Sequence, residues 1–154
     1  MTPPPSETPA AHLLTDASER TARTRALNDA ARAALPFGFA HTLITRGVAA
    51  LPPDEVAQVL DAVRGYGDFT PDNDPHGEHD FGVLTRVRRD GKADWTATPP
   101  SSPSSAVDRE TIFWKIDYYA KPREGVPPFT LGSASPWSWE ATDRVLTVYL
   151  ACEH

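Results

Sequence analysis

The chain has 154 residues and a mass of 16.8 kDa, the size of one ordinary domain with some chain to spare. Forty per cent of the residues are apolar, so the chain can build a hydrophobic core and is not wholly disordered. The net charge of −6 at pH 7 has the wrong sign for general affinity toward a phosphate backbone. Direct nucleic-acid binding is therefore not expected.

Cysteine usage and hydropathy indicate the cellular compartment. The single cysteine, Cys152, excludes an intrachain disulfide and a zinc cluster built on cysteines, and it suits a reducing cytosol. No apolar run approaches the roughly 20 residues that a membrane span needs. The N-terminus has neither the basic flank nor the apolar segment of a signal peptide. We therefore expect a cytoplasmic protein without a membrane partner.

Proline marks two segments without a core of their own. The 16 prolines are about twice the usual share of roughly 5%. Residues 1–14 are expected to be a disordered Pro-rich tail, and a long Pro/Ser-rich loop is expected at about 89–109. Residues 15–154 are then a single domain that contains this loop.

A first helix is expected over Ala17–Ala34. Asp16 is a suitable N-cap, with Glu19 at the spacing of a capping box, and Pro36 ends the helix. Its arginines are expected to form a solvated face, or alternatively a docking face for an acidic partner: Arg20, Arg23, Arg25 and Arg32.

A second helix begins at the pair Pro52 and Pro53, which suit a first helical turn, and Gly65 ends it. Asp54 and Glu55 lie at its positive end, where carboxylates are favourable. A stripe of apolar residues at helical spacing predicts the face that packs on the core: Val56, Val59, Leu60 and Val63.

Four runs of β-branched and aromatic residues predict strands: His41–Arg46, Asp80–Val87, Thr111–Tyr119 and Arg144–Cys152. The last is apolar on both faces and is expected to be central, with Cys152 as a small core residue. In the third, alternation places Lys115 and Asp117 on one face together with aromatic residues. The expected fold is α+β, a small, mostly antiparallel sheet of about four strands with two helices packed on one face.

The most informative segment lies between Arg64 and Arg86, which has no Lys or Arg and five acidic residues: Asp68, Asp72, Asp74, Glu78 and Asp80. Such carboxylates repel one another unless backbone amides, an arginine, a metal ion or a partner offset their charge. Pro, Asn and Gly make the segment a loop that leads into a strand.

Three interpretations of this loop compete. A calcium loop of the EF-hand type is disfavoured, because its last ligand position is Val83 and a strand follows it. A divalent metal site could use Asp74 and His79, with His76 nearby. In the structural interpretation, residues 72–74 form turns capped by their own side chains, and residues 78–80 pair with arginines or Lys115.

Three blocks of the sequence resemble a known family. They are Asn73-Asp74-Pro75-His76-Gly77-Glu78-His79-Asp80-Phe81-Gly82, Phe113-Trp114-Lys115-Ile116-Asp117-Tyr118-Tyr119 and Arg144-Val145-Leu146-Thr147. They are similar to the signature blocks of a bacterial family, domain of unknown function 3768, and Leu27-Asn28-Asp29 also fits its pattern. The resemblance covers residues 23–153. It implies a small bacterial cytoplasmic protein without an established activity, associated with mobile elements, for which anti-restriction or anti-CRISPR roles are conceivable.

Two functional hypotheses follow, and the residues leave open whether the chain is an enzyme. The preferred one is a regulatory or inhibitory module that binds a protein partner through the acidic loop and the aromatic strand ends. Its binding residues are Asn73, Asp74, Asp80, Tyr118, Tyr119 and Arg144.

The alternative is a hydrolytic enzyme with catalytic residues Glu78, His79, Lys115 and Asp117. His79 would be a base or a metal ligand, and Glu78 and Asp74 would be ligands or acid–base groups. Lys115 or Arg144 would stabilise an anion. This hypothesis requires the acidic loop and the third strand to bring their side chains together.

Overall fold

A computed structural model describes residues 16–97 and 110–154. The expected tail at 1–14 and most of the expected loop at 89–109 lie outside the described residues. The helices are α1 (Ala17–Ala33), α2 (Arg46–Ala49) and α3 (Pro53–Arg64), followed near the C-terminus by the 3₁₀ turn η2 (Ala151–Glu153). The strands are β1 (His41–Ile44), β2 (Phe81–Arg89), β3 (Lys92–Thr96), β4 (Thr111–Ala120) and β5 (Thr142–Leu150).

The described strands form one sheet in the order β1-β5-β4-β2-β3. β1 pairs with β5 in parallel, and the other pairs are antiparallel. The α+β class is confirmed. The sheet is mixed and has five strands where about four, mostly antiparallel, were expected, and the described helices number three where two were expected.

The additional strand β3 corrects the expectation of a loop from residue 89 onward. Arg89 pairs with Lys92, so Asp90 and Gly91 form the turn of a hairpin between β2 and β3. Both turn residues have positive φ, 51° and 75°. Asp-Gly is a strong hairpin signal because these residue types tolerate that backbone conformation. Since the proline-rich stretch begins only after β3, the loop prediction extended too far toward the N-terminus.

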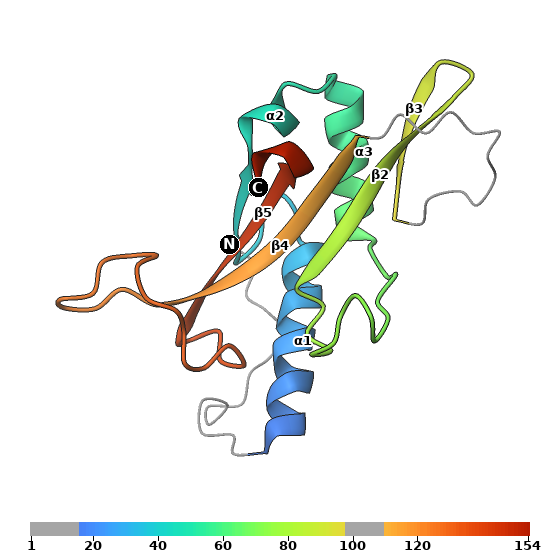
Figure 1. Cartoon of the computed structure of the whole chain (residues 1–154). Coiled ribbons are helices and arrows are strands. Elements are labelled where there is room, and N and C mark those ends of the chain that lie inside the picture. Colours follow the sequence, from blue (N-terminus) through green and yellow to red (C-terminus); the bar gives the residue numbers. More distant parts are fainter. Residues whose placement is uncertain (1–15, 98–109) are drawn as a thin grey trace.

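Helices α1 and α3 lie on the same face of the sheet, behind it in the view of Figure 1. The core forms between this face and the helices, with Trp114 completely buried at its centre. Gly82 makes room for the indole, because a Cβ at Gly82 would lie 2.3 Å from Trp114 Nε1. The other core residues include Val59, Val63, Leu84, Trp95, Ile112, Ile116, Leu146 and Val148.

The predicted N-termini of α1 and α3 are confirmed. Asp16 caps α1 by accepting the backbone N–H of Glu19, at 2.9 Å, and α3 begins at Pro53. The expectation that Cys152 is a small core residue is wrong. This cysteine is exposed in η2 instead of buried in a central strand, because β5 ends at Leu150.

Candidate functional site

The acidic segment folds around the carboxylate of Asp74. This carboxylate accepts the backbone N–H groups of Glu78, at 3.1 Å, and His79, at 3.3 Å. The side chain of Asn73 accepts the backbone N–H of Thr70, at 2.8 Å. Backbone amides therefore offset part of the acidic charge, as the structural interpretation predicts.

His79 is held between α1 and the acidic segment. Its Nδ1 lies 2.8 Å from Asp29 Oδ1, and its Nε2 lies 3.8 Å from Asp74 Oδ2. Phe69 stacks on the imidazole with ring centroids 3.8 Å apart and an angle of 6° between the rings. The backbone of His79 has φ 55°, a left-handed conformation that is uncommon for a residue other than glycine. Asp29, Asp74 and Phe69 together fix the orientation of this histidine.

An open pocket of about 410 Å³ lies beside His79. Arg32, which was expected on a solvated face, lines this pocket but is buried instead. Its guanidinium binds Asp29 and donates to the carbonyl of Tyr66 at 2.8 Å. The remaining charged side chain in the lining is Arg64. The pocket therefore contains two cations, one histidine and one carboxylate.

A second network links the acidic segment to the sheet. The hydroxyl of Tyr118 donates to Glu78 Oε2 at 2.9 Å and accepts from Asn28 Nδ2 at 2.7 Å. The same amide group of Asn28 donates to the carbonyl of Glu78 at 2.9 Å. Arg144 Nε donates to Asn28 Oδ1 at 2.9 Å. Asn28 and Arg144 are almost completely buried, so this network belongs to the interior of the protein.

Two acidic groups of this region have a raised pKa: the phenol of Tyr118 and the carboxyl group of Asp80. Burial raises the pKa of Tyr118, and the negative charges of Asp80 and Glu78 add to the effect. Tyr118 is therefore a hydrogen-bond donor at neutral pH. Burial also raises the pKa of Asp80, with a further contribution from the charge of Glu78.

We expect Asp80→Asn to raise the melting temperature at pH 7 and to give a smaller gain near pH 3. Because the folded-state pKa of Asp80 lies above the unfolded value of about 3.9, the folded protein binds more protons between the two values. Its stability therefore falls as the pH rises through this window, and asparagine removes that loss. Thermal unfolding from pH 3 to 7 measures the difference, with Asp72→Asn at an exposed position as the control. A lower melting temperature of Asp80→Asn at pH 7 would contradict the expectation.

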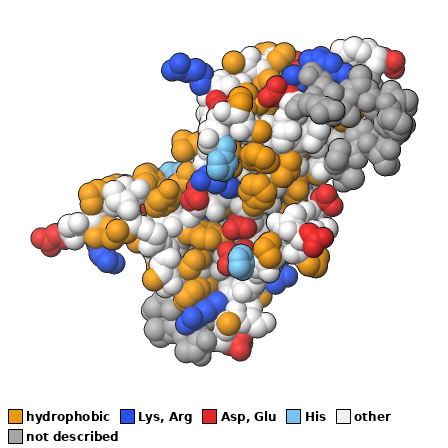
Figure 2. All heavy atoms as spheres, in the orientation of Figure 1, with side chains coloured by type: hydrophobic (Ala, Val, Ile, Leu, Met, Phe, Trp, Pro, Cys, Tyr) orange, Lys and Arg blue, Asp and Glu red, His pale blue; other side chains and the backbone are white. Residues whose placement is uncertain are grey.

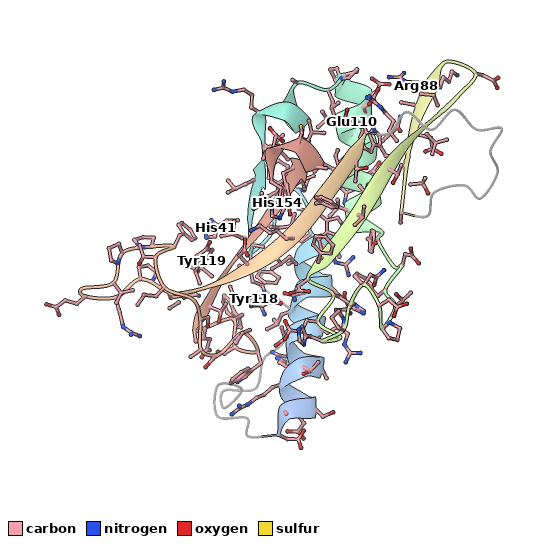
Figure 3. The ribbon with its side chains drawn as sticks, in the orientation of Figure 1. His41, Arg88, Glu110, Tyr118, Tyr119 and His154 are labelled. Atoms are coloured by element: carbon pink, nitrogen blue, oxygen red, sulfur yellow. The ribbon has the colours of Figure 1, made fainter. Side chains whose placement is uncertain are left out.

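The structure does not bring all predicted site residues together. Asn73, Asp74, Glu78, His79 and Asp80 lie in the acidic segment, which contacts Tyr118 through Glu78. Lys115, Asp117 and Tyr119 belong to the opposite face of β4 from Tyr118, since neighbouring residues of a strand alternate between faces. Figure 3 labels the neighbours Tyr118 and Tyr119 on this strand. Lys115 Nζ pairs with Asp117 Oδ2 at 2.9 Å.

The face that carries Lys115 and Asp117 is not covered by a helix of the described residues, and we call it the open face. A row of rings crosses it through Phe81, Phe113, Tyr149 and His154, with neighbouring centroids 5.7–6.0 Å apart. Figure 2 shows hydrophobic side chains gathered over the middle of the sheet on this face. A pocket of about 240 Å³ lies beside the row and is lined by Lys115, Tyr149 and His154, among others.

Sequence reasoning missed the contribution of α1 to the site. Asn28, Asp29 and Arg32 were not among the predicted functional residues, although they make the contacts described above. The signal was their spacing. Asn28 and Arg32 are four residues apart and adjoin Leu27 and Ala31, which form the apolar stripe of the helix. Polar residues beside such a stripe face the sheet.

The metal hypothesis for Asp74 and His79 gains no support from side-chain geometry. Within residues 16–97 and 110–154, no group of three or more His, Cys, Asp or Glu side chains is arranged to hold a metal ion. The carboxylate of Asp74 is instead occupied by two backbone amides.

The fold and the site define an α+β domain in which two helices and an acidic loop cover one face of a mixed sheet, whereas no helix of residues 16–97 and 110–154 covers the other face. The chain belongs to the family described as protein of unknown function (DUF3768), whose model matches residues 44–153. Asn28 and Asp29 lie before the matched residues. No curated protein and no solved structure is significantly similar to the chain. In the part of the chain that the structure describes, the helices are too short or too polar to span a membrane.

Proposed function

We propose that this domain is a protein-interaction module and that its contact surface is the open face of the sheet. The observation that carries the proposal is the row of rings formed by Phe81, Phe113 and Tyr149 across three strands, on a face without a helix in the described residues. Phe81 and Phe113 are half-buried, and Tyr149 is buried beneath the surface, so the two phenylalanines supply the contact area. Half-buried aromatic side chains supply contact area with little loss of conformational freedom, and they are enriched at protein interfaces.

The acidic segment serves this module as a scaffold. Asp74 binds backbone amides, Glu78 binds Tyr118, and the partly buried Asp80 lies close to both carboxylates. These groups are directed into the protein, so they are poorly placed to contact a partner. We therefore place the contact surface on the face that carries Lys115, Asp117 and Tyr119, and not on the acidic loop that the sequence suggested.

The chemistry of the open face favours a protein over a nucleic acid. Its lysine, Lys115, is paired with Asp117, and the chain carries a net charge of −6. A phosphate backbone requires uncompensated cations, whereas an apolar protein surface does not. Such binding would serve a regulatory or inhibitory role. Accessory proteins of mobile elements are one class of proteins with such a role.

Site-specific photo-cross-linking in the native cells tests this function. A photoreactive amino acid at Thr147, on the open face, is expected to give a discrete protein adduct. The same amino acid at Ala26, exposed on α1, and at Asp72, exposed in the acidic segment, is expected to give none. Absence of an adduct at Thr147, or equal adducts at all three positions, would contradict the proposal.

A second candidate function, acid–base catalysis, is favoured by the contact of His79 with Asp29. With its Nδ1 proton donated to Asp29, the imidazole has Nε2 available as a base. The pocket beside it is lined by Arg32 and Arg64, which pair with Asp29 and Asp61, so an anionic substrate would have to share these guanidinium groups. Lys115 and Asp117, which the sequence analysis included in the catalytic hypothesis, take no part in this mechanism, because they lie on the opposite face of the sheet.

Hydrolysis of p-nitrophenyl phosphate and p-nitrophenyl acetate tests the second candidate. His79→Gln is expected to lower kcat by about 100-fold or more if His79 is the base. His76→Gln, an exposed histidine of the same loop, is the matched control and should leave the rate unchanged. Equal rates in the two variants, or no hydrolysis by the unmodified protein, would rule out this chemistry for these substrates.

A further inference from the structure

The edge strand β1 lacks the usual protection against pairing with another chain. It lies at one end of the described sheet, beside β5 (Figure 1). Natural proteins commonly protect such a strand with charged side chains, proline or a bulge. β3, at the other end of the described sheet, carries the exposed charges of Lys92 and Asp94. β1 (His41–Ile44) contains no Lys, Arg, Pro or acidic residue.

Two residues of β1 direct their main chain away from the sheet. Thr45, directly after the strand, donates its backbone N–H to the carbonyl of Val148 on β5, at 3.1 Å. Successive residues of a strand direct their N–H and C=O groups to alternate sides, so Thr42 and Ile44 direct theirs away from β5. No strand of residues 16–97 and 110–154 lies on that side. The edge therefore offers two N–H and two C=O groups to a further strand.

The side chains of β1 are apolar and exposed as well. Leu43 is 55% exposed and Ile44 is 40% exposed, although both belong to a strand of the sheet. They point to opposite faces, since neighbouring residues of a strand alternate. A strand added to this edge would cover part of both side chains. Main-chain donors and acceptors between exposed apolar side chains are the chemistry that recognises an extended protein segment.

We propose that β1 pairs in antiparallel orientation with β1 of a second copy of this chain, about a two-fold axis that passes beside Leu43. A two-fold contact requires a surface that is complementary to itself. This register sets Thr42 opposite Ile44 of the second copy, twice, and each pair exchanges two hydrogen bonds, so that every outward group of β1 is used. The two sheets become one continuous sheet. The inference goes beyond the proposed function, because it uses the edge of the sheet and not its open face.

The residues around β1 are compatible with this register. It sets Arg46 opposite Ala40 of the second copy, so the arginines that follow the two strands do not meet each other. His41 lies opposite Thr45, which is uncharged. The ring of His41 contacts Phe129, with centroids 5.0 Å apart, and this contact is on the open face because His41 pairs with Val145. The new strand lies beside β1, so it leaves the contact between these rings in place.

A cysteine at position 43 tests the pairing and its register. Leu43→Cys is made together with Cys152→Ser, so that the chain has one cysteine. In the proposed register the two Cα atoms at position 43 form a non-hydrogen-bonded pair about 4.5 Å apart, a separation that a disulfide bridges. Oxidised glutathione is expected to convert this variant into a disulfide-linked dimer at least about 10-fold faster than the control. The control is Leu131→Cys with Cys152→Ser, since Leu131 is 50% exposed but lies beside Ala120 of β4.

A proline at position 44 tests the hydrogen bonds. Ile44→Pro removes the outward N–H and keeps the bonds to β5, and an edge strand tolerates proline at such a position. Two of the hydrogen bonds between the copies are lost, so the dissociation constant is expected to rise by about 10-fold or more. Ile44→Val keeps the N–H and is expected to dimerise nearly as well as the unmodified chain. Circular dichroism verifies that both variants fold.

Sedimentation velocity from about 5 to 500 µM measures the masses, because a contact through one short strand belongs to the small, weak class of interfaces. A monomer at all concentrations, a dimer that Ile44→Pro leaves intact, or equal rates of disulfide formation at positions 43 and 131 would each overturn the inference. The cysteine experiment decides the matter if Ile44→Pro does not fold. A cross-link from Thr147 to a different protein would support the proposed function whether or not the chain dimerises through β1.

Discussion

Replacing Asn28 by alanine is expected to lower the free energy of unfolding by about 3–5 kcal/mol. The side chain is completely buried and joins three partners that lie far apart in the sequence: Glu78, Tyr118 and Arg144. Alanine removes the hydrogen bonds to all three partners and creates a small cavity. A buried polar group that loses its partner costs about 1–3 kcal/mol, and the cavity adds to that cost. Urea unfolding followed by circular dichroism measures the change.

The control for this prediction is Asn73→Ala, the same substitution at an exposed position. Asn73 also makes hydrogen bonds to the backbone, at 2.7 and 2.8 Å, but water can replace them. The expected loss is therefore about 1 kcal/mol or less. Equal losses in the two variants would show that the network around Asn28 contributes no more to stability than a turn at the surface.

Replacing Glu55 by alanine is expected to cost about 3–5 kcal/mol as well. Glu55 lies in the first turn of α3, but its side chain is directed into the protein. Its Oε2 accepts from Arg86 Nη1 and from Trp95 Nε1, both at 3.1 Å. Removal of one partner from a buried ion pair is expensive, because the remaining charge keeps its desolvation cost. Arg86 and the buried Trp95 both lose this partner in the variant.

The neighbouring Asp54 is the matched control for Glu55. It lies in the same helical turn and is exposed, so Asp54→Ala removes only a favourable charge near the positive end of the helix. The expected loss is about 0.3–1 kcal/mol. Thermal and urea unfolding compare the two variants. A loss of similar size in both would mean that Glu55 stabilises the protein only through its position in the helix.

Glu55 also shows why sequence patterns do not predict every buried contact of the fold. At the first turn of a helix, an acidic residue is favourable whether it is exposed or buried, so its sequence context does not distinguish Glu55 from Asp54. The distinction arises because β2 and β3 bring Arg86 and Trp95 against α3. The β2–β3 hairpin itself was predictable from Asp90-Gly91, whose positive φ angles require such residue types.

The candidate site was predicted in part. The turn at residues 73–79 follows from local chemistry, because Asp74 accepts amides only four and five residues away. The approach of Asp29 to His79, and of Arg144 to Asn28, joins residues 50 and 116 positions apart. Such contacts depend on how α1 lies across the sheet, and the helical pattern shows only that one side of α1 is buried.

The sequence by itself determined the α+β class, the ends of α1 and α3, the family and the alternation that places Phe113, Lys115, Asp117 and Tyr119 on one face of a strand. These properties depend on contacts between near neighbours along the chain or on the two-residue period of a strand. Only the tertiary structure decided which face of the sheet α1 and α3 cover. That choice depends on the packing of Trp114 against Gly82 and the helices, and it separates Lys115 and Asp117 from His79 by leaving them on the open face.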